Sequence, residues 1–249
     1  MKNLRPLVIV VGLFIAWQLL VSISDVPPYI LPAPLAVFVA FFRQPALFAH
    51  HAVITALEIL LGLLFGFLLG TGCALFMSYF RPAQRWLLPV LVISQAIPVF
   101  ALAPILVLWL GYGLASKVAM ATLIIFFPVT ASFYDGLRQT DTGWIDLAIT
   151  MNASRWSILR HVRLPAAMPA LGSGLRVAAA VAPIGAIVGE WVGSGAGLGY
   201  LMLHANARVQ VDIMFAALLL LSFMAVGLYF AVDVAMHRLI RWRNTDFST

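Results

Sequence analysis

Charged residues are scarce in this sequence. Only 10% of its 249 residues are Asp, Glu, Lys or Arg, whereas 63% are hydrophobic, and soluble domains are nearer a quarter charged. So few charges cannot cover a water-exposed surface, which excludes an ordinary soluble globular protein. The apolar residues also come in long runs, each near the roughly 20 residues that span a hydrocarbon core as a helix. We therefore expect an all-α, polytopic membrane protein in contact with membrane lipid.

Cysteine is nearly absent as well, and so is any nucleotide-binding loop. Cys73 is the single cysteine and lies inside an apolar run, so neither a disulfide framework nor a thiolate metal site is available. The net charge of +6 comes from short segments between apolar runs, not from a continuous basic patch, so nucleic acid is not an expected partner. No stretch matches Gly-x-x-x-x-Gly-Lys-Ser/Thr, so this chain cannot cradle nucleotide phosphates in the P-loop manner.

Six apolar stretches divide the chain. They run over Leu4 to Ile23, Val53 to Tyr79, Leu87 to Leu110, Val118 to Tyr134, Gly174 to Val192 and Ile213 to Met236. We expect about six transmembrane helices in one domain that covers residues 1–249. Eleven of the Lys and Arg residues fall on one side of this arrangement and three on the other, with Arg176 at the start of the fifth stretch. By the positive-inside rule, both termini are then cytoplasmic.

The first stretch also has features of a secretory signal. Lys2 and Arg5 precede its apolar run, and Ser22 and Ser24 are small residues just before Asp25. Removal of this stretch would leave five spans and an outer N-terminus, which the remaining loops allow. We keep the six-span arrangement as the expectation.

The third stretch is interrupted by three prolines, Pro89, Pro98 and Pro104. Each proline removes a backbone donor and frees a carbonyl about one turn earlier. At membrane depth, a broken backbone persists only where protein or a water-filled cavity satisfies it. Because Ser94 and Gln95 lie beside the break expected at Pro98, they are candidates for lining a translocation pathway. A kinked helix that only packs is the alternative.

Two rows of glycine occur at four-residue spacing. They comprise Gly62, Gly66 and Gly70 in the second stretch, and Gly185, Gly189 and Gly193 in the fifth. Such rows let helix backbones approach closely in lipid, where the hydrophobic effect does not drive packing. They indicate either packing inside one subunit or a seam between two copies.

Two acidic residues, Glu58 and Glu190, lie within the expected spans, where an ionisable group normally faces the bundle interior or a wet cavity. A glycine-rich run follows Glu190 and suits a gate-like loop, so Glu190 is a third candidate for the pathway. A structural ion pair, or snorkelling to the outer surface, explains Glu190 equally well. The adjacent His50 and His51 in the first outer loop have no third ligand nearby, so we expect them to be solvated.

One long polar excursion, residues 135–173, is expected on the cytoplasmic side. A simple hairpin between spans needs only a handful of residues. Acidic residues come early in the segment and basic residues late, which complements a helix dipole, and its apolar residues recur at helical spacing. A small polar break at Asn152, Ala153 and Ser154 divides the segment into two short helices, and Pro165 is expected to stop the second. Such a rigid segment offers a binding surface to a soluble partner protein.

This segment resembles the cytoplasmic motif of permeases of binding-protein-dependent ABC importers. That motif reads Glu-Ala-Ala, three residues, Gly, nine residues, then Ile-x-Leu-Pro. The matching residues here are Asp146-Leu147-Ala148, then Asn152, then Val162-Arg163-Leu164-Pro165. The spacing is kept, and the departures are modest, since Asn, like Gly, tolerates a left-handed turn.

The resemblance extends over nearly the whole chain and is strongest to the nitrate, sulfonate and taurine branch. The matching segments are Leu31-Pro32-Ala33-Pro34, Ile97-Pro98 through Ala103-Pro104, Gly174-Leu175-Arg176 and Gly197-Leu198-Gly199. Within that branch, Phe126-Phe127-Pro128-Val129 and Tyr134-Asp135-Gly136-Leu137-Arg138 are more similar to members assigned to pyrimidine precursors of thiamine.

The resemblance implies a type I ABC importer permease fold in a bacterial inner membrane. It also implies a second permease copy, two cytoplasmic ATPase subunits that bind the ATP and Mg, and a periplasmic or lipid-anchored solute-binding protein. No cofactor is then expected in this chain, which is a permease and not itself an enzyme. The residues expected to couple to the ATPase are Asp146, Ala148, Asn152, Ala153, Ser154, Val162, Leu164 and Pro165.

Two other classes of function remain as rivals. A self-sufficient secondary transporter or channel needs ion or proton sites and often shows inverted repeats, but no internal repeat is visible and acidic residues within spans are few. An intramembrane enzyme needs a nucleophile with a base, or a metal cluster. His204 and His237 are far apart in sequence and no paired motif accompanies them.

Overall fold

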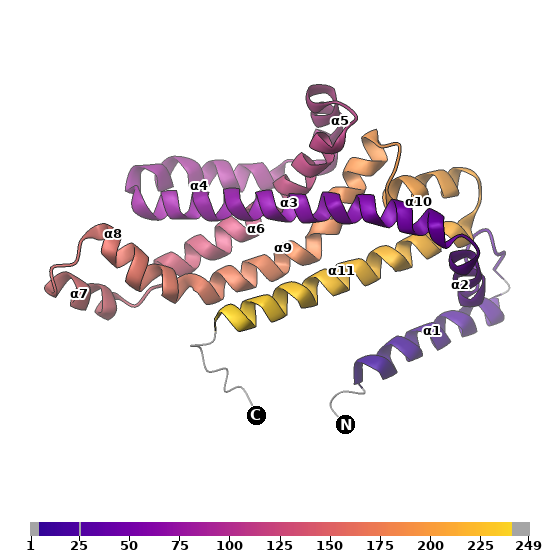
Figure 1. Cartoon of the computed structure of the whole chain (residues 1–249), viewed down its shortest axis with the longest axis horizontal. Helices are drawn as coiled ribbons and strands as arrows, with labels where there is room; N and C mark the ends of the chain where they lie inside the picture. The colour runs from indigo at the N-terminus through magenta and orange to yellow at the C-terminus, as the bar shows by residue number, and fades with distance from the viewer. Residues whose placement is uncertain (1–4, 25, 241–249) are drawn as a thin grey trace.

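The computed structural model describes residues 5–24 and 26–240, which form helices joined by short connections (Figure 1). In chain order the elements are α1 (Arg5–Ser24), α2 (Pro34–Arg43), α3 (Pro45–Tyr79), α4 (Arg81–Ala96), α5 (Val99–Leu110), α6 (Leu114–Arg138), α7 (Thr142–Thr150), α8 (Arg155–Ile158), a π-helical turn (Leu159–Arg163), α9 (Leu164–Gly193), α10 (Leu198–Ala207) and α11 (Val211–Leu239). The all-α prediction is confirmed for these residues.

Four helices are long and apolar enough to cross a membrane: α3, α6, the helix from Arg155 to Gly193, and α11. The pair α4 and α5 makes a fifth span if it is counted as one, despite a bend of 100° at its break. The first expected span forms α1, in which Val8–Ser24 is a shorter apolar helix. Length and composition therefore establish four or five spans in the described chain, against the six expected.

The core lies where α6 packs against α3 and α9. A Cβ atom added at any glycine of the α3 row would collide with a side chain of α6, and the residues struck are Ala121, Ile125 and Val129. Three glycines one turn apart therefore let the two helix backbones come together along their length. This row packs inside the subunit.

The glycine row of α9 meets α6 and α5 in the same way. A Cβ at Gly185 would lie 2.6 Å from the Cα of Ala121, and one at Gly189 would lie 3.0 Å from the Cα of Lys117. At Gly193 the obstacle is Val107 of α5, at 2.7 Å. Of the two interpretations given by the sequence, packing within one subunit is the one that the structure supports for both rows.

The third expected span is broken at Pro98, as predicted. Helix α4 ends at Ala96, Ile97 and Pro98 are extended, and α5 begins at Val99. Pro89 and Pro104 lie inside α4 and α5 and do not end them. Apart from Leu91, the large apolar side chains of α4 are half-buried or exposed.

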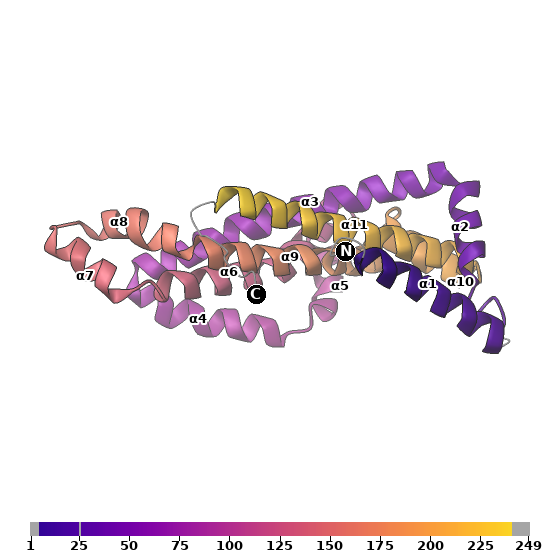
Figure 2. The ribbon, with the colours of Figure 1, turned by 90° about the horizontal axis from the view of Figure 1, so that it is seen from below.

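Helices α7 and α8 lie at one end of the molecule, and α2 and α10 lie at the other (Figures 1 and 2). The side chain of Asp141 caps α7 by accepting a hydrogen bond from the Gly143 N–H at 2.7 Å. Ser154 caps α8 by accepting one from the Ser157 N–H at 3.2 Å. The expected division of the segment into two short helices is therefore present.

The expected stop at Pro165 is wrong. The helix that begins at Arg155 continues to Gly193, passing through the π-helical turn, in which the Leu164 N–H donates to the carbonyl of Leu159. Pro165 has no N–H to donate and its ring crowds the carbonyl one turn earlier, and a local widening of the helix accommodates both defects. The fifth span thus starts well before Gly174, and Arg176 lies inside the helix instead of at its start.

Candidate functional site

The turn between α7 and α8 has a defined geometry. Asn152 has a φ of 58°, in the left-handed region. Its N–H donates to the carbonyl of Ile149 at 2.8 Å, and the N–H of Ala153 donates to the carbonyl of Ala148 at 2.9 Å. This pair of bonds is the Schellman motif, whose left-handed position favours Gly or Asn. Asn152 therefore ends α7 and fixes the direction in which the chain enters α8.

The surface around this turn is unusually apolar for the end of a helical hairpin. Five large side chains on α7, the turn and α8 are more than half exposed: Trp144, Leu147, Ile149, Met151 and Trp156. Large exposed apolar side chains gathered in one short segment mark sites of contact with another protein or with a membrane.

The structure brings part of the predicted coupling set together. Ala148, Val162 and Pro165 line a cavity of about 920 Å³ between α7, the start of α9 and the end of α6. Asp146, Asn152 and Ser154 are exposed, and Ala153 and Leu164 are half-buried; none of these five lines the cavity.

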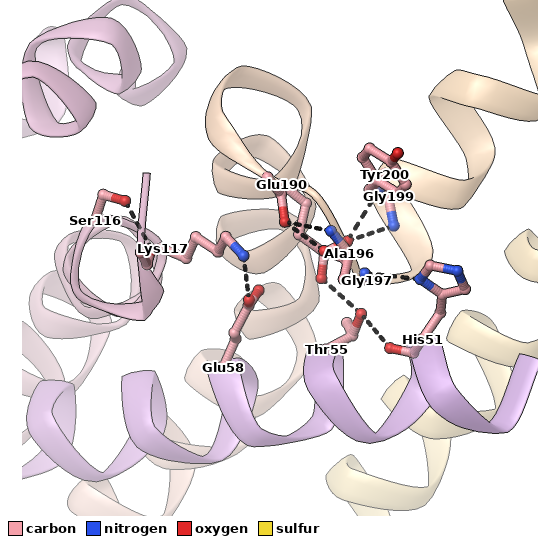
Figure 3. A network of polar contacts seen from close by, with 12 residues as sticks. His51, Thr55, Glu58, Ser116, Lys117, Glu190, Ala196, Gly197, Gly199 and Tyr200 are labelled. Atoms are coloured by element: carbon pink, nitrogen blue, oxygen red, sulfur yellow. Dashed lines mark hydrogen bonds and ion pairs between the residues drawn. The ribbon is translucent and has the colours of Figure 1, made fainter. Parts of the chain in front are cut away.

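A second group of polar residues lies between α3, α6, α9 and the start of α10 (Figure 3). The carboxylate of Glu190, on α9, accepts a hydrogen bond from the Thr55 hydroxyl of α3 at 2.6 Å. It also accepts from the N–H of Gly199 and from the N–H of Tyr200, at 3.3 Å for the latter. The Thr55 hydroxyl in turn accepts from the Leu198 N–H at 2.8 Å. Glu190 and Thr55 together hold the start of α10 against α3 and α9.

An ion pair extends this group to α6. The Nζ of Lys117 lies 2.9 Å from Oε1 of Glu58, and the two side chains are 8% and 0% exposed. The carboxylate of Glu58 faces that of Glu190 across the same space (Figure 3). The cluster thus combines two acidic side chains and one basic side chain, all withdrawn from solvent.

His51 belongs to the cluster, contrary to the expectation that it is solvated. It is 7% exposed, and its Nδ1 accepts a hydrogen bond from the Gly197 N–H at 3.0 Å. Its neighbour His50 is exposed, as expected. The structure gives the physical reason: α3 begins at Pro45, so the first outer loop is shorter than expected and His51 is already helical.

The three candidate pathway residues are not brought together within one subunit. Ser94 and Gln95 are exposed on α4, and the Ser94 hydroxyl donates to the carbonyl of Leu91 at 2.7 Å. Glu190 is 1% exposed, and its hydrogen bonds among the described residues go to α3 and α10. Glu190 is therefore a buried, hydrogen-bonded side chain: among the described residues it forms no ion pair, and it does not extend to the outer surface.

Sequence reasoning missed three members of the buried cluster: His51, Thr55 and Lys117. Lys117 directly precedes the fourth expected span, Val118 to Tyr134, yet it lies in α6 and pairs with Glu58. A signal was present, because positions 51, 55 and 58 follow one another at four and three residues. That spacing puts them on one face of a helix.

Comparison with known proteins adds four findings. Residues 62–244 match the family model described as "Binding-protein-dependent transport system inner membrane component". The chain is 58% identical to a probable ABC transporter permease protein of Haemophilus influenzae, with 96% of this chain and 98% of that protein covered. It is 35% identical to the formylaminopyrimidine transport permease protein ThiX of Halalkalibacterium halodurans, with 98% and 97% covered. Among solved structures, the inward-facing MetNI methionine ABC transporter matches with a TM-score of 0.67 at 22% identity, covering 80% of this chain and 97% of that one.

Proposed function

We propose a transport mechanism for this chain, which belongs to the family of binding-protein-dependent transport system inner membrane components and is a permease subunit of an ABC importer. Two copies form the transmembrane pathway, two ATPase subunits drive it from the cytoplasm, and a solute-binding protein delivers the solute on the other side. Both termini are cytoplasmic in this proposal. Closure of the ATPases moves the helices around Asn152 and switches the pathway between inward and outward openings.

The observation that carries the proposal is the turn between α7 and α8. Its Schellman geometry fixes two short helices at a set angle, and the surrounding apolar side chains are exposed. A solvated loop needs neither feature, whereas a segment that transmits force to a soluble subunit needs both rigidity and a surface that excludes water. We propose that this subunit is an ATPase, and the support is that relatives are named as ABC transporter permeases.

A second copy is supported by α4 and α5. Gln95, an exposed amide, lies two residues before the backbone break at Ile97 and Pro98, in a helix pair of bilayer-spanning composition. Unpaired backbone and amide groups do not face lipid tails at membrane depth, so protein or a water-filled pathway covers this surface. We expect Gln95→Cys, in a Cys73→Ser background, to form a disulfide between two copies in the membrane. Absence of the cross-link would argue against a pathway formed between the two α4 helices.

The solute is a small organic molecule, and a pyrimidine precursor of thiamine is the first candidate. The support is the relative named for formylaminopyrimidine transport. Other relatives are named for riboflavin and taurine transport, so a sulfonate, nitrate or taurine-like solute is an alternative candidate. Few polar side chains of this chain are available to contact a solute, which leaves most of the selection to the binding protein. A purified binding protein should therefore be titrated with a formylaminopyrimidine, riboflavin, taurine and nitrate.

Reconstitution tests the proposal as a whole. Vesicles that contain the permease and its ATPase should concentrate solute only when ATP and the loaded binding protein are both present. Vesicles with the permease alone should not. Concentrative uptake by the permease alone would identify a secondary transporter and overturn the proposal.

A further inference from the structure

A pocket of about 300 Å³ opens beside the buried cluster, between the start of α3, α10 and the start of α11. Its polar lining consists of Gln44, His51, Tyr200, His204, Arg208 and Gln210, and the remaining lining residues are apolar. The lining residues come from α10 and from the starts of α3 and α11, and α10 lies at the end of the molecule opposite α7 and α8 (Figure 1). It is small for a ligand site, and suits a single side chain or a small acid better than a large solute.

The pocket offers hydrogen-bond donors of fixed direction. Because the Nδ1 of His51 accepts from the Gly197 N–H, the neutral ring carries its proton on Nε2. The ring of Tyr200 stacks on His51 with centroids 6.0 Å apart and contacts His204 at 4.1 Å. These contacts hold both imidazoles in place before anything binds, so little ordering remains to be done on binding.

The charge of the pocket is positive. Arg208 brings a guanidinium group, its side chain is exposed, and none of the ion pairs in the described part of the chain involves it. No acidic side chain lines the pocket. A guanidinium with a fixed imidazole donor beside it is suited to bind a carboxylate.

The turn at the rim of the pocket is strained. Val209 has a φ of 59°, in the left-handed region, and its side chain is 63% exposed. The Val209 N–H donates to the carbonyl of Asn206 and the Gln210 N–H to that of Ala205, the same Schellman pattern as at Asn152. A β-branched residue at a position that favours Gly or Asn is an outlier of the kind found at functional sites.

We infer that this pocket receives an acidic side chain of the solute-binding protein, with Arg208 as the ion-pair partner and Val209 as an apolar contact at the rim. The inference rests on the proposed function, which places a binding protein at the end of the permease away from the ATPase. The exposed strained valine favours a protein surface over a free solute, because a small acid inside the pocket would not cover it.

The test uses the complete transporter, permease with its ATPase, in lipid nanodiscs. ATP hydrolysis is measured against the concentration of solute-loaded binding protein, for wild type, Arg208→Glu and Arg43→Glu. Arg43 is the matched control, because it is an exposed arginine at the end of α2, at the same end of the molecule but outside the pocket. We expect Arg208→Glu to raise the half-saturating concentration of binding protein about tenfold or more, since it places two like charges together. Arg43→Glu should change it less than about twofold, as for a screened rim charge.

The outcomes separate the two proposals. A wild-type transporter that does not respond to any loaded binding protein contradicts the proposed function itself. If the wild type responds and Arg208→Glu responds equally, the inference that the binding protein docks at this pocket is wrong. An equal loss in both arginine variants also overturns that inference, because it would indicate general attraction by the whole face. Stimulation by free solute without binding protein, lost in Arg208→Glu, would assign the pocket to solute and overturn the docking inference.

Discussion

Replacing Glu190 by alanine should weaken the fold at the end of the bundle that holds α10. The carboxylate accepts hydrogen bonds from the Thr55 hydroxyl and from the N–H groups of Gly199 and Tyr200. In Glu190→Ala the two N–H groups lose their partner, and each buried donor left unpaired costs about 1–3 kcal/mol. Thr55 can turn its hydroxyl to the carbonyl of His51, 3.2 Å away, so the loss of its bond to Glu190 adds little to the cost of the substitution. The expected loss in the free energy of unfolding is about 2–5 kcal/mol.

Glu190→Gln is the matched control. The Gln oxygen can accept from the Gly199 N–H, and its NH₂ group can donate to the Thr55 hydroxyl, which then donates to the carbonyl of His51. Most of the hydrogen bonds are therefore kept, and we expect Glu190→Gln to lose less than about half of the unfolding free energy that Glu190→Ala loses.

Unfolding of the purified permease in mixed detergent micelles measures the difference. ATP-dependent uptake should fall in Glu190→Ala, whereas copurification with the ATPase should be unchanged because α7 and α8 lie at the other end (Figure 1). If Glu190→Ala unfolds with the wild-type free energy, the cluster does not hold α10. Wild-type uptake kinetics in the same variant would remove Glu190 from any role in transport.

Three further predictions concern the bundle. Gly185→Ala should lower the free energy of unfolding by about 1–3 kcal/mol, because the new methyl group overpacks against the α6 backbone. Gly72→Ala should not lower it, because nothing lies within 4 Å of the new Cβ. Lys117→Met should cost about 3–5 kcal/mol by leaving Glu58 buried and unpaired, and adding Glu58→Met should recover part of that loss; additive losses would mean that the ion pair is not coupled. Gln95→Ala should alter uptake kinetics while the ATPase still copurifies, and unchanged kinetics would remove Gln95 from the pathway.

Local signals were enough to predict the all-helical class, the break at Pro98 and the division of the segment after α6. Each depends on a few neighbouring residues: a proline that cannot donate, or an Asn that tolerates a left-handed turn. The error at Pro165 shows the limit of such signals, because a π-helical turn absorbed the proline and the helix continued.

The buried cluster depends on tertiary packing and was therefore harder to predict. Glu58 and Lys117 are 59 positions apart, and they meet only because the α3 glycine row brings α3 against α6. Glu190 reaches Gly199 because the chain reverses between α9 and α10. The sequence showed that these residues were unusual inside spans, but not which of them would be neighbours.

The central claim, that the turn around Asn152 connects this permease to a separate ATPase, is tested most directly by Ala153→Glu. The substitution puts an unpaired charge into a surface that is desolvated in the complex, at a cost of about 3–5 kcal/mol, whereas on a solvated loop it would cost almost nothing. Ala207→Glu, at the exposed end of α10 on the opposite side of the molecule, is the control. With normal membrane insertion of both variants, ATPase retention should be lost in Ala153→Glu and kept in Ala207→Glu, and ATP-dependent uptake should be lost in Ala153→Glu. Normal retention and uptake in Ala153→Glu would show that this segment is only a solvated loop and would contradict the account.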